Sequence, residues 1–307
     1  MKVIVIGNCS IDVSFSVPRL PKPGETLLAR SRTVDLGGKG ANQAVAAARF
    51  GAETILAVPI GSDADGDMAC ARLSAEGLSL AIKRTGTPTD QSIIYVAPDG
   101  QNCIVSSQEA ACRADAEWAE GVLQKEGQRG DLLLVQGNLP LRTTLVALGL
   151  GRRLGMRTLL NPAPIQYEYD ELLALADTVI LNEIEAGELS GHVDPLDAGR
   201  AIHEWGPSSV IVTLGPRGAA LIEDELVVVP APVVEAVDTV GAGDTLCGAF
   251  AAGLADGRGS AVALRIGVDA ASLTVTRRGT QSSFPTTSEA LNILAAREAP
   301  EHRDRRD

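Results

Sequence analysis

The chain has 307 residues, of which 45% are hydrophobic, so it can bury a large core as one α/β domain or as a domain with a small appendage. The 39 Asp and Glu residues outnumber the 27 Lys and Arg residues, and the formal charge of -12 would repel a nucleic-acid duplex or an anionic membrane surface. The basic cluster at the C-terminus, REAPEHRDRRD, alternates arginine with acids, and we expect residues 299–307 to form a solvated tail. Neither nucleic acid nor a membrane is therefore expected as a partner.

The cysteines, the histidines and the apolar runs argue against four further features. The five cysteines have no paired spacing, which argues against a disulfide framework, and the three histidines lie too far apart in sequence for the usual zinc spacings. The apolar run in MKVIVIGN is too short for a signal peptide, and no segment reaches the run of about 18 apolar residues that a membrane-spanning helix needs. We expect a cytoplasmic protein.

Short apolar runs that end in Gly, Asn or Pro recur along the chain and are typical of parallel strands buried on both faces. In chain order they are VIVIG (3–7), ILAVPIG (55–61), DLLLVQGN (131–138), RTLLNPAP (157–164), DTVILNE (177–183) and SVIVTLG (209–215). Alanine-rich stretches with helical spacing lie between them, such as ANQAVAAARFG (41–51), MACARLSAEGL (68–78) and LRTTLVALGLGRRLG (141–155). This alternation predicts one α/β domain over residues 1–298, with a doubly wound, mostly parallel sheet and helices on both faces. Ligands of such sheets bind at the carboxyl ends of the strands.

Two segments interrupt the alternation. Residues 11–36 and 90–106 alternate apolar and polar positions, as half-exposed antiparallel strands do, and the second segment has the hairpin signal Asp99-Gly100. They predict a small sheet that stands off the main domain. This sheet is either a lid over a binding site or an ordinary edge meander.

A glycine-rich stretch, DLGGKGANQAVAAARFG (35–51), precedes the first alanine-rich helix. Its glycines allow close approach of a ligand, and the amides of Asn42 and Gln43 in the first helical turn can be held toward a polar group. The stretch is neither a Walker loop nor a dinucleotide-binding fingerprint, because GxxxxGK[ST] and GxGxxG are both absent. Taken alone, such a helix start is more often a packing device than a binding site.

Two strand ends carry further candidates. Asn182 and Glu185 lie three residues apart on one helix face, where they either complement the helix dipole or form a magnesium site in which the carboxylate acts through water. The turn in VTLGPRGA (212–219) is explained by its Gly and Pro residues, but it can also offer Thr213 and Arg217 to phosphates.

The stretch DTVGAGDT (238–245) is harder to explain as a simple helix start. Gly241, Ala242 and Gly243 present consecutive N–H groups without bulky side chains, and that combination makes an anion hole. Asp244 follows in the first helical turn. A carboxylate beside a bound phosphate is unfavourable unless it has a task, and phosphoryl transfer supplies one, since the acceptor hydroxyl must lose a proton.

Three of these stretches, GGKGANQA (37–44), NEIE (182–185) and DTVGAGDT, resemble signature motifs of the PfkB (ribokinase-like) family of carbohydrate kinases, and their order and spacing agree over residues 1–286. The resemblance implies a ribokinase-like α/β sheet domain with a small β lid that commonly also forms a dimer interface. It further implies transfer of the γ-phosphate of ATP to a sugar hydroxyl, with Mg²⁺ required and K⁺ often activating.

The resemblance also implies roles for the matching residues. Asp244 looks like the catalytic base, and Gly241, Ala242 and Gly243 look like the anion hole. Substrate contacts are implied for Ser10, Asp12, Gly38, Lys39, Asn42, Asn138 and Asp244. Nucleotide contacts are implied for Asn182, Thr213, Gly215, Arg217, Gly218 and Gly243, with Glu185 organising Mg²⁺ through water. Because VTRRGTQSSFP (275–285) resembles a ribokinase segment, a monovalent-cation loop is implied for Asp238, Val240, Thr274, Arg277, Gly279 and Ser283.

Three departures leave the substrate open. Ser10 stands where the family's ribokinases carry Asn, Asn138 stands where they carry Glu, and the segment VSSQEAACRA (105–114) lacks the usual Gly-Ala-Asn. An amide in place of a carboxylate changes which sugar hydroxyls can be satisfied in a closed site. A nucleoside kinase of the same family is the alternative, and a non-catalytic sugar or nucleotide sensor is a third reading that would need a broken base or anion hole.

The lid strands also bear on the oligomeric state. Val13, Phe15 and Val17 share one face in the predicted strand, with Ile94 and Val96 nearby. This apolar surface can either be buried in a homodimer formed through the lid strands or close only over a ligand.

Overall fold

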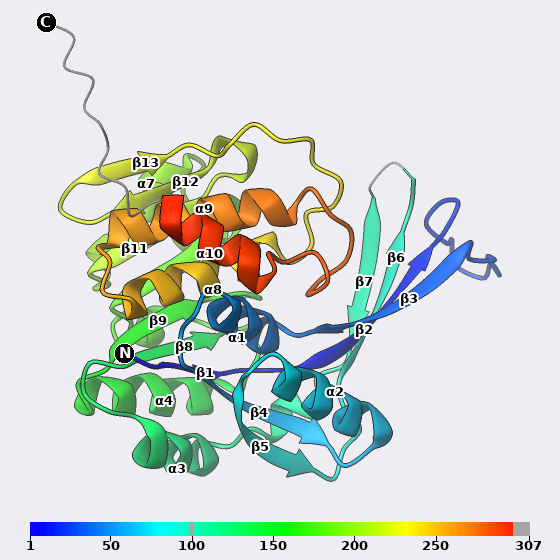
Figure 1. Ribbon diagram of the computed structural model, residues 1–307, viewed down its shortest axis with the longest axis horizontal. Coiled ribbons are helices and arrows are strands. Elements are labelled where there is room, and N and C mark those ends of the chain that lie inside the picture. The colour runs from blue at the N-terminus through cyan, green and yellow to red at the C-terminus, as the bar shows by residue number, and fades with distance from the viewer. Residues whose placement is uncertain (99–100, 297–307) are drawn as a thin grey trace, which may run out of the picture.

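The computed structural model describes residues 1–98 and 101–296 (Figure 1). A large α/β body carries a small sheet that projects from one side (Figure 1). The predicted tail at 299–307 and the predicted turn at Asp99-Gly100 lie outside the described residues. Within the described ranges, no helix combines the length and the apolar character that crossing a membrane requires.

The large sheet has nine strands in the order β13-β12-β11-β10-β9-β8-β1-β4-β5. They are β1 (Val3–Ile6), β4 (Thr54–Gly61), β5 (Ser79–Thr85), β8 (Leu132–Gln136), β9 (Arg157–Asn161), β10 (Thr178–Asn182), β11 (Ser209–Thr213), β12 (Ala219–Ile222) and β13 (Leu226–Val229). The strands from β5 to β11 pair in parallel, whereas β12 and β13 extend the sheet antiparallel. The sheet runs outward from β1 in both directions, which confirms the doubly wound, mostly parallel arrangement predicted from the sequence.

Helices cover both faces of this sheet (Figure 1). They are α1 (Lys39–Arg49), α2 (Ala64–Ala75), α3 (Ala116–Glu126), α4 (Leu141–Arg153), α5 (Asp170–Leu173), α6 (Glu183–Ser190), α7 (Pro195–Glu204), α8 (Ala242–Ala255), α9 (Ser260–Thr274) and α10 (Thr287–Ala296), with short 3₁₀ turns at Ala111–Arg113 and Gly215–Arg217. Alternate residues of β1 belong to two different core clusters, one on each face of the sheet, because successive side chains of a strand point to opposite faces. Val3 and Val5 pack with residues of α1, α8 and α9, while Ile4 and Ile6 pack with residues of α3 and α4.

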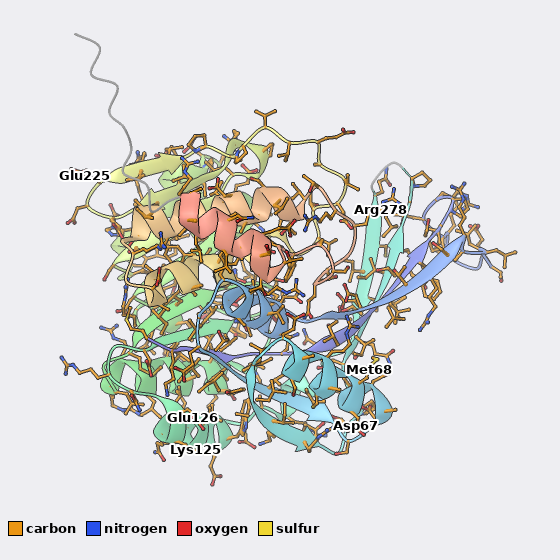
Figure 2. All side chains as sticks on the ribbon, viewed as in Figure 1. Asp67, Met68, Lys125, Glu126, Glu225 and Arg278 are labelled. Carbon is orange, nitrogen blue, oxygen red and sulfur yellow. The ribbon has the colours of Figure 1, made fainter. Side chains whose placement is uncertain are left out.

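The lid sheet has four strands in the order β3-β2-β6-β7. Its strands are β2 (Ser10–Ser16), β3 (Ser31–Gly37), β6 (Gln91–Val96) and β7 (Asn102–Ser106). The predicted small sheet is therefore present, with β2 and β6 as its parallel central pair and antiparallel strands on both edges. Met68 on α2, labelled in Figure 2, and Phe15 of this sheet both pack against the same buried core cluster.

The register of the lid sheet refines the predicted apolar face. Val13 lies beside Ile93, and Phe15 lies beside Tyr95 with the two rings stacked at 6.0 Å between centroids. Ile94 pairs with a serine of β2 instead, so it points to the opposite face of the sheet. The apolar lid residues are thus divided between the two faces.

Polar side chains gather where four neighbouring strands of the large sheet end. Gln136 and Asn161 pair at the ends of β8 and β9, and Asn182 pairs with Thr213 at the ends of β10 and β11. The carboxyl ends of parallel strands share one edge of the sheet, which is where ligands of this fold class bind.

Candidate active site

Helix α8 begins in a way that only glycine allows. Gly241 is its N-cap with φ of 78°, and a Cβ at this position would lie 2.6 Å from Cε1 of Phe284. A Cβ at Gly243 would meet no atom within 4 Å, so a side chain at this position would have room. The N–H of Ala242 makes a long 3.3 Å bond to the carbonyl of Thr239, so the triplet predicted as an anion hole is only partly free of protein partners. Because the first N–H groups of a helix lack intrahelical acceptors, this end of α8 suits an anion.

Asp244 lies in the first turn of α8 and is 7% exposed. Its Oδ2 accepts from Nδ2 of Asn42 at 2.9 Å, and its Oδ1 accepts from Nε2 of Gln43 at 3.0 Å. Nζ of Lys39 is 3.9 Å from Oδ1, and the negative charge of Asp244 raises the pKa of this lysine, which therefore keeps its proton. The first turn of α1 thus surrounds the predicted catalytic base with one cation and two amide donors.

Close packing between α1 and α8 sets these distances. A Cβ at Gly248, one helical turn after Asp244, would lie 2.4 Å from the carbonyl oxygen of Gln43 and 2.6 Å from Cβ of Ala46. At the start of α1, Gly38 has φ of 89° and a Cβ there would lie 2.6 Å from Cα of Cys9. Gly38 of the first glycine motif therefore serves close packing, as the sequence allowed, and Gly248 on α8 does the same. This packing brings the polar residues of α1 and α8 together.

The sugar end of the predicted site lies at the root of the lid sheet. Asp12 is 8% exposed, and its two oxygens accept from Oγ of Ser10 at 3.0 Å and Oγ1 of Thr280 at 3.1 Å. Burial raises the pKa of the Asp12 carboxyl, while these hydroxyl donors oppose the shift. Gln281, next to Thr280, donates to Oδ1 of Asn42 at 3.1 Å, so one loop links Asp12 to the residues around Asp244.

Asn138, the remaining sequence-predicted sugar contact, follows β8. Its Oδ1 is buried and has no hydrogen-bond partner among the described residues. An amide oxygen in this condition is unfavourable in the protein alone, and a ligand donor would satisfy it.

The nucleotide residues predicted from the sequence lie along β10 and β11. The side chain of Asn182 caps α6 through bonds to the N–H groups of Ile184 and Glu185, and the Glu185 carboxylate accepts from the N–H of Asn182 in return. Burial raises the pKa of Glu185, and the positive charge of Lys39 opposes that shift. Asn182 and Glu185 thus form a capping box, a structural role at the N-terminus of α6 that fits the helix-dipole alternative, on the same strand edge as Thr213.

The turn after β11 completes this side. Gly215 to Arg217 form a 3₁₀ turn, and Gly218 has φ of 99° with room for no side chain, since a Cβ would lie 2.0 Å from the carbonyl oxygen of Val229. Arg217 pairs on the surface with Glu183 at 2.6 Å. In the part of the chain that the structure describes, no three His, Cys, Asp or Glu side chains form a metal site by themselves. A Mg²⁺ ion held mainly by water and phosphate oxygens needs only one carboxylate, and Glu185 supplies that donor type.

The residues predicted as a cation loop are partly brought together. Asp238 accepts from the N–H groups of Val240 at 3.1 Å and Gly279 at 3.2 Å, which joins the two segments. The side chains of Thr274 and Ser283 bond elsewhere, to Thr245 at 3.1 Å and to the carbonyl of Thr280 at 2.7 Å. Arg277 forms a bidentate ion pair with Glu289, so its side chain is already bonded within the protein.

The sequence assigned no individual contact to four residues of this site, although Asn161 was one of the polar strand ends expected to line it. Gln136 and Asn161 bond to Gln43, and Thr280 and Gln281 bond to Asp12 and Asn42. The signal available in the sequence was position: Asn161 and Gln136 end predicted strands, and the other two lie in VTRRGTQSSFP. Their partners could not be read from the sequence.

A helix N-terminus that suits an anion, beside a buried carboxylate, is an arrangement that phosphoryl transfer to a hydroxyl can use. The chain belongs to the pfkB family of carbohydrate kinases, whose family model matches residues 1–287. It is therefore a sugar kinase, which uses ATP to phosphorylate a sugar hydroxyl.

Similar proteins agree with this assignment. A ribokinase of Haemophilus influenzae is 36% identical over 301 residues, covering 94% of this chain and 97% of the relative. A deoxyribokinase of Salmonella typhi is 33% identical over 307 residues, covering 97% of this chain and all of the relative. The crystal structure of a Thermotoga maritima ribokinase matches with a TM-score of 0.87 at 33% identity, over 96% of this chain and 99% of that one. An Arabidopsis thaliana ribokinase complexed with ribose and ATP matches with a TM-score of 0.82 at 27% identity, over 95% of this chain and 98% of that one.

Proposed function

We propose that this sugar kinase phosphorylates a primary hydroxyl of a pentose, with Asp244 as the general base. The observation that carries the proposal is the position of the Asp244 carboxylate, buried at the N-terminus of α8 and held by amides and a lysine of α1. The relatives named ribokinase and deoxyribokinase, at 36% and 33% identity, make a pentose the first acceptor to test.

The chemistry follows from this arrangement. Asp244 accepts the proton of the hydroxyl, the hydroxyl oxygen attacks the γ-phosphorus in line, and the bond from that phosphorus to the bridging oxygen of ADP breaks. The N–H groups of Ala242 and Gly243 stabilise the charge on the transferred group, and Lys39 adds positive potential. Ser10, Asp12, Gly38, Asn42 and Asn138 hold the sugar under the lid sheet.

The nucleotide and its metal ion belong to the neighbouring strand ends in this proposal. Asn182, Thr213, Gly215, Arg217 and Gly218 line the nucleotide side. Glu185 holds Mg²⁺ through water, and the ion supplies positive charge to the phosphates when it is bound. Breaking the ion pair between Arg217 and Glu183 costs little free energy, because exposed ion pairs are weak. Arg217 can therefore exchange Glu183 for a phosphate.

A monovalent cation, K⁺ in the first instance, is proposed beside the anion hole. Its support is the hydrogen bonding of Asp238 to Val240 and Gly279, which joins the loop before α8 to the loop after α9. Thr274, Arg277 and Ser283 would take part through backbone oxygens, since their side chains bond elsewhere.

A homodimer through the lid strands is also proposed. Val34 and Val105 lie on one face of the lid sheet and Val96 and Ile104 on the other, and all four are between 37% and 64% exposed. Each face of the lid sheet therefore offers exposed apolar side chains that a second copy of the chain could cover. Sedimentation of the purified protein tests this, and a monomer at micromolar concentration would contradict it. The predicted cytoplasmic location stays a prediction.

The proposed function is tested by measuring ADP release from Mg-ATP with a panel of pentoses, hexoses and nucleosides, in K⁺ and in Na⁺. We expect turnover with a pentose, a lower KM for it than for any hexose or nucleoside, and faster turnover in K⁺. Turnover of a nucleoside alone would replace the acceptor in the proposal. No turnover of any acceptor would refute it.

A further inference from the structure

Buried amides connect the central sheet to Asp244, and Gln43 is their centre. Its Nε2 donates to Oδ1 of Asp244 and to Oδ1 of Asn161, both at 3.0 Å, and its Oε1 accepts from Nε2 of Gln136 at 2.8 Å. Gln43 and Gln136 are completely buried, and Asn161 is 6% exposed. Both N–H donors and the oxygen of the Gln43 amide are therefore used inside the protein.

The backbone of the sheet fixes the direction of these hydrogen bonds. Nδ2 of Asn161 donates to the carbonyl oxygen of Ile180 at 2.8 Å, and a carbonyl can only accept. The Oδ1 of Asn161 must therefore face Gln43, and the NH₂ group of Gln43 must donate to it. Rotating the Gln43 amide by half a turn would set its oxygen against two other acceptors, Asn161 and Asp244. The sheet thus dictates that a donor faces the carboxylate.

We propose that Gln43 is a positioning residue that makes the two oxygens of Asp244 unequal; this rests on the proposed role of Asp244 as base. Oδ1 is held by the fixed Gln43 donor and lies 3.9 Å from the Lys39 ammonium. Within the described residues, Oδ2 accepts one side-chain hydrogen bond, from Asn42, which is placed among the sugar contacts. Oδ2 is then the oxygen that accepts a hydrogen bond from the acceptor hydroxyl and takes its proton. The negative charge on Oδ1 is stabilised by Gln43 and Lys39.

One detail speaks against a role in stability alone. Oε1 of Gln136, at the far end of the network, is buried and has no hydrogen-bond partner in the described ranges. An apolar residue at this position would avoid that unfavourable group. A glutamine at position 136 is explained if its Nε2 is needed to hold the Gln43 amide in one orientation.

The test uses two variants of the full chain. Gln43→Glu keeps the shape but replaces the donor by a second carboxyl group, and two carboxylates in contact cannot both ionise easily. We expect kcat at neutral pH to fall about 10- to 100-fold, and the acidic limb of the kcat profile to move up by about one pH unit. Gln43→Met removes the donor without adding charge, and we expect a loss in kcat of about tenfold with little change in the KM for ATP.

A matched control is Thr143→Val on α4, which removes a buried 2.7 Å hydrogen bond to the carbonyl of Ala114 away from the site. It should lower the melting temperature without changing kcat or the pH profile. If Gln43→Met fails to fold, Gln136→Met replaces it, because it releases the Gln43 amide and leaves Gln43 in place; a kcat loss of about three- to tenfold is then expected.

Three results would overturn the proposal: folded Gln43 variants with kcat close to that of the wild type, a pH profile that does not move in Gln43→Glu, or full activity in a folded Gln136→Met. Asp244→Asn is measured beside them. If Asp244→Asn stays active, the proposed function fails; if it is inactive while the Gln43 variants behave as wild type, only the inference about Gln43 fails.

Discussion

Gly248→Ala tests whether the distance between α1 and α8 controls catalysis. The new methyl group would lie 2.4 Å from the carbonyl oxygen of Gln43, whereas ordinary contact begins at 3.4 Å, so the two helices must separate by about 1 Å at this level. Asp244 is one turn away on the same helix face. Its bonds to Asn42 and Gln43, at 2.9 and 3.0 Å, would then stretch beyond hydrogen-bonding distance.

The magnitude follows from opposing contributions. Replacing a helical glycine by alanine gains about 1 kcal/mol, and overpacking costs about 1–3 kcal/mol. Loss of hydrogen bonds to the charged carboxylate adds roughly 1.5–3 kcal/mol. A net destabilisation of about 1.5–5 kcal/mol would lower the melting temperature by roughly 3–10 °C, at about 2 °C per kcal/mol for a chain of this size. A catalytic loss of about tenfold corresponds to 1.4 kcal/mol of lost positioning in the transition state.

Calorimetry and steady-state kinetics with the preferred sugar measure both effects. The control is Gly253→Ala on the same helix, where the new methyl group would lie 3.0 Å from Cβ of Ala263 on α9 and leave the α1 contact untouched. It should lower stability slightly and preserve kcat. A Gly248→Ala enzyme that loses stability but retains full kcat would refute the reasoning.

Two further predictions concern the sugar and nucleotide sides. Because burial raises the pKa of Asp12 above its ordinary value of 3.8, its contribution to stability is complete below that pH and is lost as the pH rises through the folded-state pKa. Asp12→Asn should therefore match or exceed the wild-type melting temperature at neutral pH, lose that advantage near pH 4, and raise the KM for sugar about tenfold or more. A variant that is less stable at neutral pH would contradict this sign. Gly218→Ala should be destabilised by backbone strain on the order of 1–3 kcal/mol, and its KM for ATP should rise more than that for sugar. Unchanged stability and ATP kinetics would contradict the close packing against Val229.

The central strands of the large sheet could be predicted from the sequence, whereas the strands at its edges could not. Strands such as β8 are buried on both faces, so their residues form continuous apolar runs that are visible without a structure. The edge strand β5 reads SLAIKRT, and its charged residues pair with helices: Lys83 with Asp115, and Arg84 with Asp67. Such a mixed sequence gives no clear strand signal. The antiparallel pair β12 and β13 was missed for a similar reason, since its strands have only four residues each.

For the site, the sequence revealed the residues but not their partners. The glycine motifs predicted a helix N-terminus with a carboxylate, and α8 has both. The bond from Gln43 to Asp244 joins residues 201 positions apart, and its direction depends on a carbonyl of a third element. No local pattern carries that information. For Glu185 the structure does not decide between the two interpretations of NEIE. Its capping bond to Asn182 is compatible both with a structural role at the start of α6 and with a magnesium site.

The most direct test of the account is Asp244→Asn, assayed with Mg-ATP, K⁺ and the preferred sugar. The amide keeps the size of a side chain that is 7% exposed, so the fold should survive. Because general-base catalysis contributes about 10²- to 10⁴-fold, kcat should fall by that factor, while the KM for ATP stays close to that of the wild type. A folded Asp244→Asn enzyme with a kcat within about threefold of the wild-type value would contradict the assignment of Asp244 as the base.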